Sequence, residues 1–159
     1  MSMILELHAV TDDEISGLLD GDAETSEAFL SNDGTSIDKA WDGIHFALTG
    51  KGMTGGSGTM SYEPFGNRYL DAVDAGYGPA TYLAPEETAI VARHLKGISA
   101  DDFAALVNAD AMRAAEVYPI QPTETDADVR AFLAPAFEEM RAFYLDAASR
   151  GLSVVTVMK

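Results

Sequence analysis

Hydrophobic side chains are spaced as in strands near both ends of the chain and as in helices through most of its middle. Residues 3–10 alternate weakly between aliphatic and polar positions, and residues 152–158 are the run richest in β-branched side chains. Both patterns predict strands, and we expect the two to share one sheet. Residues 68–73 and 81–83 predict two more short extended segments.

The rest of the chain carries helical spacing with helix-starting and helix-ending residues. Thr11 and Glu14 form a capping box, and Pro85 is placed to open a helix. Pro135 lies inside the last helical pattern and should kink that helix or mark its true start. The predicted helices cover residues 11–20, 23–30, 38–49, 85–96, 99–107, 110–116 and 125–150.

Two local details complete the predicted layout. In the helix over 99–107, Phe103, Leu106 and Val107 are expected to form the buried side. Residues 118–122 are expected to be extended, because the two residues that precede prolines there are pushed out of the helical region. With strands at both ends and a helix-rich middle, the sequence predicts an α+β fold. We expect a small mixed sheet, covered by about six helices, in a single domain over residues 1–159.

The helix predicted over residues 38–49 is the segment around which we expect the rest of the chain to pack. It contains the only tryptophan, and one of its faces carries Trp41, Ile44, His45 and Leu48. Asp38 is placed to cap its start, and Gly50 is placed to end it.

Gly43 lies in the middle of this helix and needs an explanation. A glycine inside a helix costs about 1 kcal/mol relative to alanine, and the close approach of another segment or of a ligand is the usual compensation. One interpretation is a core helix whose Trp41 fills the interior and whose His45 has a structural partner. The other is a pocket wall, with Trp41 as a stacking surface and His45 as a polar contact. The first is the commoner arrangement in proteins.

The charge of the chain is strongly negative and unevenly distributed. Ten Lys and Arg stand against 26 Asp and Glu, which gives a net charge of −16. This argues against nucleic acid and anionic membranes as partners. The first 38 residues hold ten acidic residues and no Lys or Arg. Such a field can attract a basic partner, or it can simply keep the surface solvated.

The sequence also bears on location and on the kinds of reactive site. It has no cysteine, no run of about 20 apolar residues and no signal-peptide layout, so we expect a cytoplasmic protein. Residues 50–59 are rich in glycine and match neither a nucleotide-binding loop nor a nucleophile elbow in their context. We expect them to form a flexible loop that could act as a lid. The three histidines lack zinc-site spacing, and neither a metal nor a cofactor is expected.

Several blocks of the sequence resemble the YfbM-like family of small bacterial cytoplasmic proteins (DUF1877, a domain of unknown function). The most specific blocks are D-K-A-W-x-G-I-H over residues 38–45 and G-Y-G-P-A over 76–80, and further matches lie near residues 1–4, 11–15 and 117–119. The resemblance covers nearly the whole chain and implies an α+β fold without an assigned activity. The family tends to carry a basic residue where this chain has Thr81, so an anion bound by that residue in relatives would lack its contact here.

Two hypotheses for function follow. The preferred one is a binding module, such as an immunity-type or antitoxin-like partner of a basic protein, without catalysis. The alternative is a small-molecule or enzymatic site between the Trp41/His45 face and the turn at 76–79, where glycines on both sides hold Tyr77 exposed. The residues predicted to bind a ligand are Asp38, Lys39, Trp41, His45, Tyr77 and Tyr118.

Overall fold

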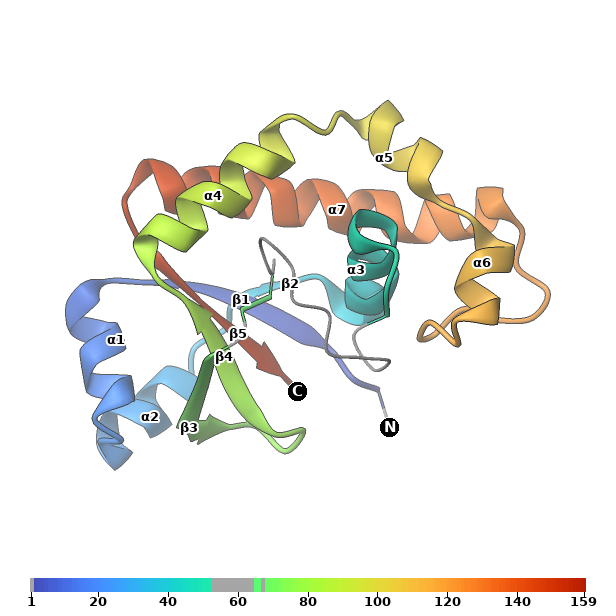
Figure 1. Cartoon of the computed structure of the whole chain (residues 1–159). Helices are drawn as coiled ribbons and strands as arrows, with labels where there is room; N and C mark the ends of the chain where they lie inside the picture. The colour runs from blue at the N-terminus through green and yellow to red at the C-terminus, as the bar shows by residue number, and fades with distance from the viewer. Residues whose placement is uncertain (1, 53–64, 67) are drawn as a thin grey trace.

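The structure is a computed structural model that describes residues 2–52, 65–66 and 68–159. A five-stranded sheet of strand order β2-β1-β5-β4-β3 lies between helices (Figure 1). The elements are β1 Leu5–Val10, α1 Asp12–Leu19, α2 Ala23–Leu30, β2 Thr35–Ser36, the 3₁₀ helix η1 Asp38–Ala40, α3 Trp41–Thr49, β3 Arg68–Asp74, β4 Pro79–Leu83, α4 Pro85–Lys96, α5 Ala100–Leu106, α6 Ala109–Ala114, α7 Asp126–Ser149 and β5 Ser153–Met158. The α+β class predicted from the sequence is therefore confirmed, while most of the loop predicted over 50–59 falls outside the described residues.

The central strand of the sheet is β5. Its register with β1 runs from Leu5 opposite Met158 to Val10 opposite Ser153, which confirms that the two terminal strands pair. Every described strand pair is antiparallel, so the prediction of a mixed sheet was wrong. The apolar run of β5 resembles a strand of a parallel sheet, but it arises because helices cover both faces of an antiparallel one.

The two faces of the sheet carry separate hydrophobic cores. Val154 of β5 belongs to the larger core, which the helices α3, α4, α5 and α7 cover. Val155 and Val157 belong to the smaller core beneath α1 and α2. Strand residues alternate between faces, so β5 is buried on both sides. Figure 1 shows α4 and α7 running side by side above the sheet, with α1 and α2 set apart from them.

The start of the central helix differs from the prediction. The α-helix begins at Trp41, and Asp38 opens the short 3₁₀ turn before it with a positive φ of 49°. The residue at the N-cap of α3 is Ala40, which makes no side-chain capping bond, so the assignment of Asp38 as cap was wrong. An Asp tolerates the left-handed region, and this lets the chain turn before the helix starts. Gly50 ends the helix with φ 74°, as predicted.

Gly43 is explained by helix packing. An added Cβ there would lie 2.7 Å from Cδ2 of Leu133, a fully buried residue of α7. The missing side chain thus lets α3 and α7 approach closely. It is the side chain of Leu133, and no ligand, that accounts for this glycine.

Two further predictions were wrong. Leu106, expected to be buried, is the last residue of α5 and is 46% exposed. Residues 118–122 are not simply extended, because Val117 to Ile120 form a turn in which Ile120 N donates to Val117 O at 3.1 Å. The Tyr118–Pro119 peptide bond in this turn is cis, a geometry that the restriction on residues before proline does not reveal.

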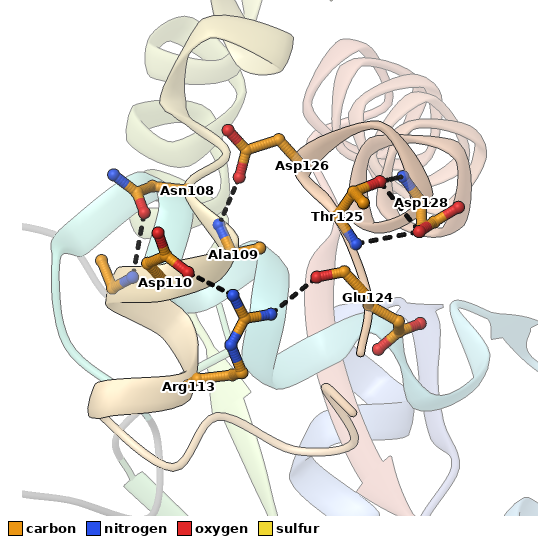
Figure 2. A network of polar contacts seen from close by, with 9 residues as sticks. Asn108, Ala109, Asp110, Arg113, Glu124, Thr125, Asp126 and Asp128 are labelled. Carbon is orange, nitrogen blue, oxygen red and sulfur yellow. Dashed lines mark hydrogen bonds and ion pairs between the residues drawn. The ribbon is translucent and has the colours of Figure 1, made fainter. Parts of the chain in front are cut away.

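A polar network fastens α6 to the beginning of α7 (Figure 2). The Asp126 side chain accepts from Ala109 N at 2.7 Å, and the Arg113 guanidinium donates to Glu124 O at 2.6 Å. Thr125 and Asp128 form a capping box that starts α7. The helix runs on through Pro135, so that proline does not mark its start. Neither α7 nor any other described helix is long and apolar enough to cross a membrane.

The Gly43–Leu133 contact predicts that Gly43→Ala changes the free energy of unfolding in opposite directions in two backgrounds. Gly43→Ala alone should lower the free energy of unfolding by about 1–2 kcal/mol, because overpacking outweighs the gain in helix propensity. In a Leu133→Ala background, the same substitution should raise the free energy of unfolding by about 1 kcal/mol, since only the propensity term remains. Chemical denaturation of the four proteins measures both effects. Equal effects in the two backgrounds would contradict this account of Gly43.

Candidate functional site

The predicted ligand residues Trp41, which is buried, and Tyr118, which is half-buried, lie together at the start of α3. Their rings stack with centroids 5.6 Å apart and planes at 26°. Trp41 is buried, and its indole N–H donates to Met3 O at 3.0 Å. These contacts describe a tryptophan that joins the N-terminal segment to α3 as part of the core.

His45 lies one turn further along α3 and is also buried. Its Nδ1 atom is 2.7 Å from Lys51 O, and its ring stacks on Phe65 at 6.2 Å between centroids. Asp42 lies on the same helix and is fully buried, although the sequence analysis did not single it out. A carboxylate oxygen of Asp42 accepts the backbone N–H of Tyr118 at 2.8 Å. Asp42 thereby holds the turn after α6 against the first turn of α3.

The other predicted ligand residues lie on the surface or near it. Asp38 is exposed and Lys39 is half-buried, both in η1. Tyr77 is 38% exposed at the tip of the β3–β4 hairpin, as the glycines on either side predicted. Within the described part of the chain, no ring contact or hydrogen bond joins Tyr77 to Trp41 or His45. The pocket between them stays a prediction.

A different part of the chain forms a hollowed surface with convergent polar groups. Two adjoining hollows, each of about 390 Å³, lie where α1, α2, β1 and the segment before β2 meet. We call them together the acidic groove. They share Glu14, Phe29 and Asn32 as walls. The first is completed by Leu7, His8, Ala9, Val10, Asp33, Gly34, Thr35 and Phe143, and the second by Leu18, Asp22, Glu24, Thr25 and Ala28.

The acidic groove carries four carboxylates and no cation among its walls. The carboxylates are Glu14, Asp22, Glu24 and Asp33. None of them forms an ion pair with a described Lys or Arg. Hydrogen bonds from the Thr25 hydroxyl and backbone N–H lower the pKa of Asp22, so this carboxylate stays charged well into the acidic range. The groove is therefore a negative surface whose carboxylates form no ion pair with a described Lys or Arg.

The first hollow has a buried imidazole in its wall. His8 is 8% exposed, and its ring packs against Phe29 with centroids 4.6 Å apart. Its Nε2 atom is buried and makes no well-formed hydrogen bond to a described residue, but it lies within ion-pair distance of Glu6 Oε2, at 3.4 Å. Buried polar atoms normally have partners, and the Glu6 carboxylate is the group within reach of this ring nitrogen.

Burial decides the protonation of His8. Burial lowers the pKa of His8 and outweighs the opposing influence of the Glu6 carboxylate. Burial alone would raise the pKa of Glu6, but the hydrogen bond and charge of Lys159, at 2.7 Å, bring it below its ordinary value. At neutral pH the wall of the hollow thus holds a neutral imidazole beside a carboxylate that is already paired with Lys159.

Gly34 fixes where the imidazole lies. An added Cβ at Gly34 would be 2.6 Å from His8 Nε2 and 2.7 Å from Leu7 O. Only a residue without a side chain fits against both atoms. The sequence analysis missed this close approach, because the approach depends on which strand the segment before β2 reaches.

The described residues include no group of three or more His, Asp or Glu side chains that could hold a metal ion. What the acidic groove offers chemically is therefore charge, hydrogen-bond acceptors and the aromatic surface of Phe29. The sequence analysis identified the excess of acid in this part of the chain but not the groove. The missing signal was the burial of His8, which a lone histidine in a strand pattern does not disclose.

The lowered pKa of His8 predicts a loss of stability on acidification. The unfolded chain binds a proton near the ordinary pKa of 6.5 and the folded one binds it only at lower pH, so the free energy of unfolding falls as the pH drops below 6.5. The slope reaches at most about 1.4 kcal/mol per pH unit. Denaturation of the wild type and of His8→Leu between pH 8 and pH 5 measures it. The variant should show the flatter pH dependence, and equal slopes would contradict the assignment.

The packing of Gly34 predicts a second effect on stability. Gly34→Ala should lower the free energy of unfolding by about 1–3 kcal/mol, because the new methyl group overlaps backbone and ring atoms. Gly97→Ala is the matched control, since a Cβ there meets only His94 O at 3.5 Å with φ −77°. That change should be neutral or stabilising by up to about 1 kcal/mol. Similar losses in both variants would refute the close approach at Gly34.

Comparison with known proteins supports the family that the sequence blocks indicated. The model of the family described as Domain of unknown function (DUF1877) matches residues 1–157. Among solved structures, the chain is similar to a protein of unknown function, YfbM from Escherichia coli, with a TM-score of 0.74, 18% sequence identity and 100% of both chains covered. At that identity the likeness concerns the fold alone. No curated protein matches the chain. The chain belongs to the DUF1877 family and shares its fold with YfbM, as the blocks at residues 38–45 and 76–80 predicted.

Proposed function

We propose that the protein is a binding module that captures a basic segment of a partner protein in the acidic groove. The observation that carries this proposal is the set of four carboxylates in the groove walls, which no described Lys or Arg neutralises. Negative charge without internal compensation favours a cationic ligand and speeds its approach.

The distribution of the cations supports the same proposal. Arg141 donates to Leu95 O and Lys96 O, both at 3.0 Å, at the end of α4, and Arg130 donates to Ala104 O at 3.1 Å near the end of α5. These arginines stabilise helix ends on the far face of the sheet. Both arginines thus bind backbone carbonyls near their own helix and are not directed at α1 and α2.

The apolar walls suit the side chains that a basic partner would bring. Lysine and arginine carry long alkyl stems beneath their charges, and these stems pack well on aromatic surfaces. Phe29, half-buried, lies in the wall of both hollows beside Glu14. A stem on Phe29 with its charge at a carboxylate would use both features at once.

The class of partner follows from the same reasoning. An immunity-type or antitoxin-like protein that neutralises a basic toxin fits a small, acidic binding module, and a cytoplasmic location is part of this proposal. Nucleic acid and anionic membranes do not fit, because the groove would repel their phosphates.

Removing charge in the acidic groove should weaken binding to a basic probe. The groove variant is Glu14→Gln, Glu24→Gln and Asp33→Asn, and the control variant is Glu138→Gln, Glu139→Gln and Asp101→Asn at exposed positions of α7 and α5. Both remove three negative charges. With a fluorescent peptide of alternating lysine and valine as probe, the groove variant should lose about tenfold more affinity than the control. Added salt should reduce that difference. Equal losses would mean that only net charge matters, and the groove would not be the site.

A further inference from the structure

We propose that the acidic groove binds its basic segment as an extended strand, antiparallel to β1 and hydrogen-bonded to the backbone of Ala9. This inference rests on the proposed function, since it specifies the form in which the basic partner is held. It follows from which backbone groups of β1 already have partners and which do not.

The alternation of hydrogen bonds along β1 identifies the outward-pointing groups. Ile4 and Lys159 exchange both backbone bonds, Ile4 N to Lys159 O at 2.7 Å and Lys159 N to Ile4 O at 2.8 Å. In an antiparallel pair, hydrogen-bonded and non-hydrogen-bonded positions alternate. Glu6, His8 and Val10 therefore bond to β5, and the residues that alternate with them direct their N–H and C=O groups away from it. Those residues are Leu5, Leu7 and Ala9.

The first two of these outward positions are paired and the third is not. Leu5 O accepts from Ile37 N at 3.0 Å, and Leu7 lies opposite Thr35 of β2. The same register would put Asp33 opposite Ala9, but β2 begins only at Thr35. No described residue makes a hydrogen bond to the outward N–H and C=O groups of Ala9. The close packing of Gly34 on His8 and Leu7 turns the chain aside at this point.

Ala9 lies in the wall of the first hollow, so the unpaired backbone faces a space that can hold a ligand. The hollow of about 390 Å³ is within the usual size range of binding pockets. His8 also lies in the wall of this hollow. An unpaired strand edge, the carboxylates of Glu14 and Asp33, and a cavity coincide here. Binding by strand addition satisfies main-chain groups of this kind and takes its specificity from alternate side chains.

The two faces of the sheet predict the pattern of the segment. A residue opposite Ala9 would put its side chain on the face where Ala9 and Phe143 pack against the larger core, so an apolar side chain fits there. Its two neighbours would point to the other face, toward the ring of Phe29 and the carboxylate of Glu14. Basic side chains fit those places. The segment expected is basic, apolar, basic.

The opposite edge of the sheet does not offer the same combination. The edge strand β3 has an interrupted register between Leu70 and Asp74, and such irregularity discourages the addition of a strand. Neither hollow of the acidic groove reaches β3. The negative charge of the acidic groove and an unpaired backbone edge occur together at β1.

The test uses three peptides of one sequence and one charge. The parent is an acetylated hexapeptide of alternating lysine and valine. The second carries N-methyl groups on its valines. A valine is the residue expected opposite Ala9, where it would exchange backbone hydrogen bonds with it. The third carries them on its lysines, whose N–H groups point away from β1. With the full chain, the valine-methylated peptide should bind about tenfold more weakly than the other two, because the hydrogen bond from the valine N–H to Ala9 O is lost.

Measurements on the protein complete the test. Nuclear magnetic resonance of the ¹⁵N-labelled full chain should show the Ala9 amide shifting and exchanging with solvent more slowly when the parent peptide is bound. Ala9→Pro removes this N–H without breaking a bond to β5 and should weaken parent binding by about tenfold, while Ala9→Ser, which keeps the N–H, should not. The folded state of both variants is checked by their spectra.

The outcomes separate this inference from the proposed function. Equal binding of all three peptides, with an unchanged Ala9 amide but with affinity lost in the groove variant, overturns strand addition and leaves the acidic groove as the site. Binding that ignores both the methyl groups and the groove substitutions overturns both proposals. Failure of the parent peptide to bind at low salt also overturns both.

Discussion

The ladder between β1 and β5 is the constraint on which the rest of the structure depends. It joins segments near the two ends of the chain over six residue pairs and puts β5 at the centre of the sheet, with β4 on its other side. Because Val154 faces one core and Val155 the other, this single strand contributes buried side chains to both cores. The helix α7 reaches β5 through Gly151, whose φ of 64° permits the sharp change of direction. Its buried stripe then covers the larger core.

The same ladder determines where the sheet stays open. On its outer side β1 pairs with β2, which has only two residues. Gly34 lies just before β2, where contact with Leu7 O and the ring of His8 excludes any side chain. One tight contact thus creates both the hollow beside His8 and the unpaired backbone at Ala9. The acidic helices α1 and α2 lie over the same end of β1, so the negative charge and the open edge meet at one place.

Much of the fold was predictable because its signals are local. The capping boxes at Thr11 and Thr125, and the glycine ends at Gly50 and Gly151, depend on residues close in sequence. Asp38 was mistaken for a cap because a capping residue and an Asp in the left-handed region have the same residue type. The candidate site was harder to predict from the sequence. The burial of His8 and Asp42, and the close packing of Gly34, depend on contacts between segments far apart in the chain, for which a single sequence has no pattern.

The position of Gly43 against Leu133 favours a structural role for the central helix α3. A glycine that admits a leucine from α7 makes α3 a packing element, and the bond from Trp41 to Met3 O and the stack on Tyr118 agree with that role. The acidic groove stands on different grounds. Its carboxylates supply long-range attraction without direction, whereas an unpaired strand edge supplies direction without long-range attraction. A surface that carries both can attract a basic segment quickly and hold it in one register, and neither the charge nor the edge could do this alone.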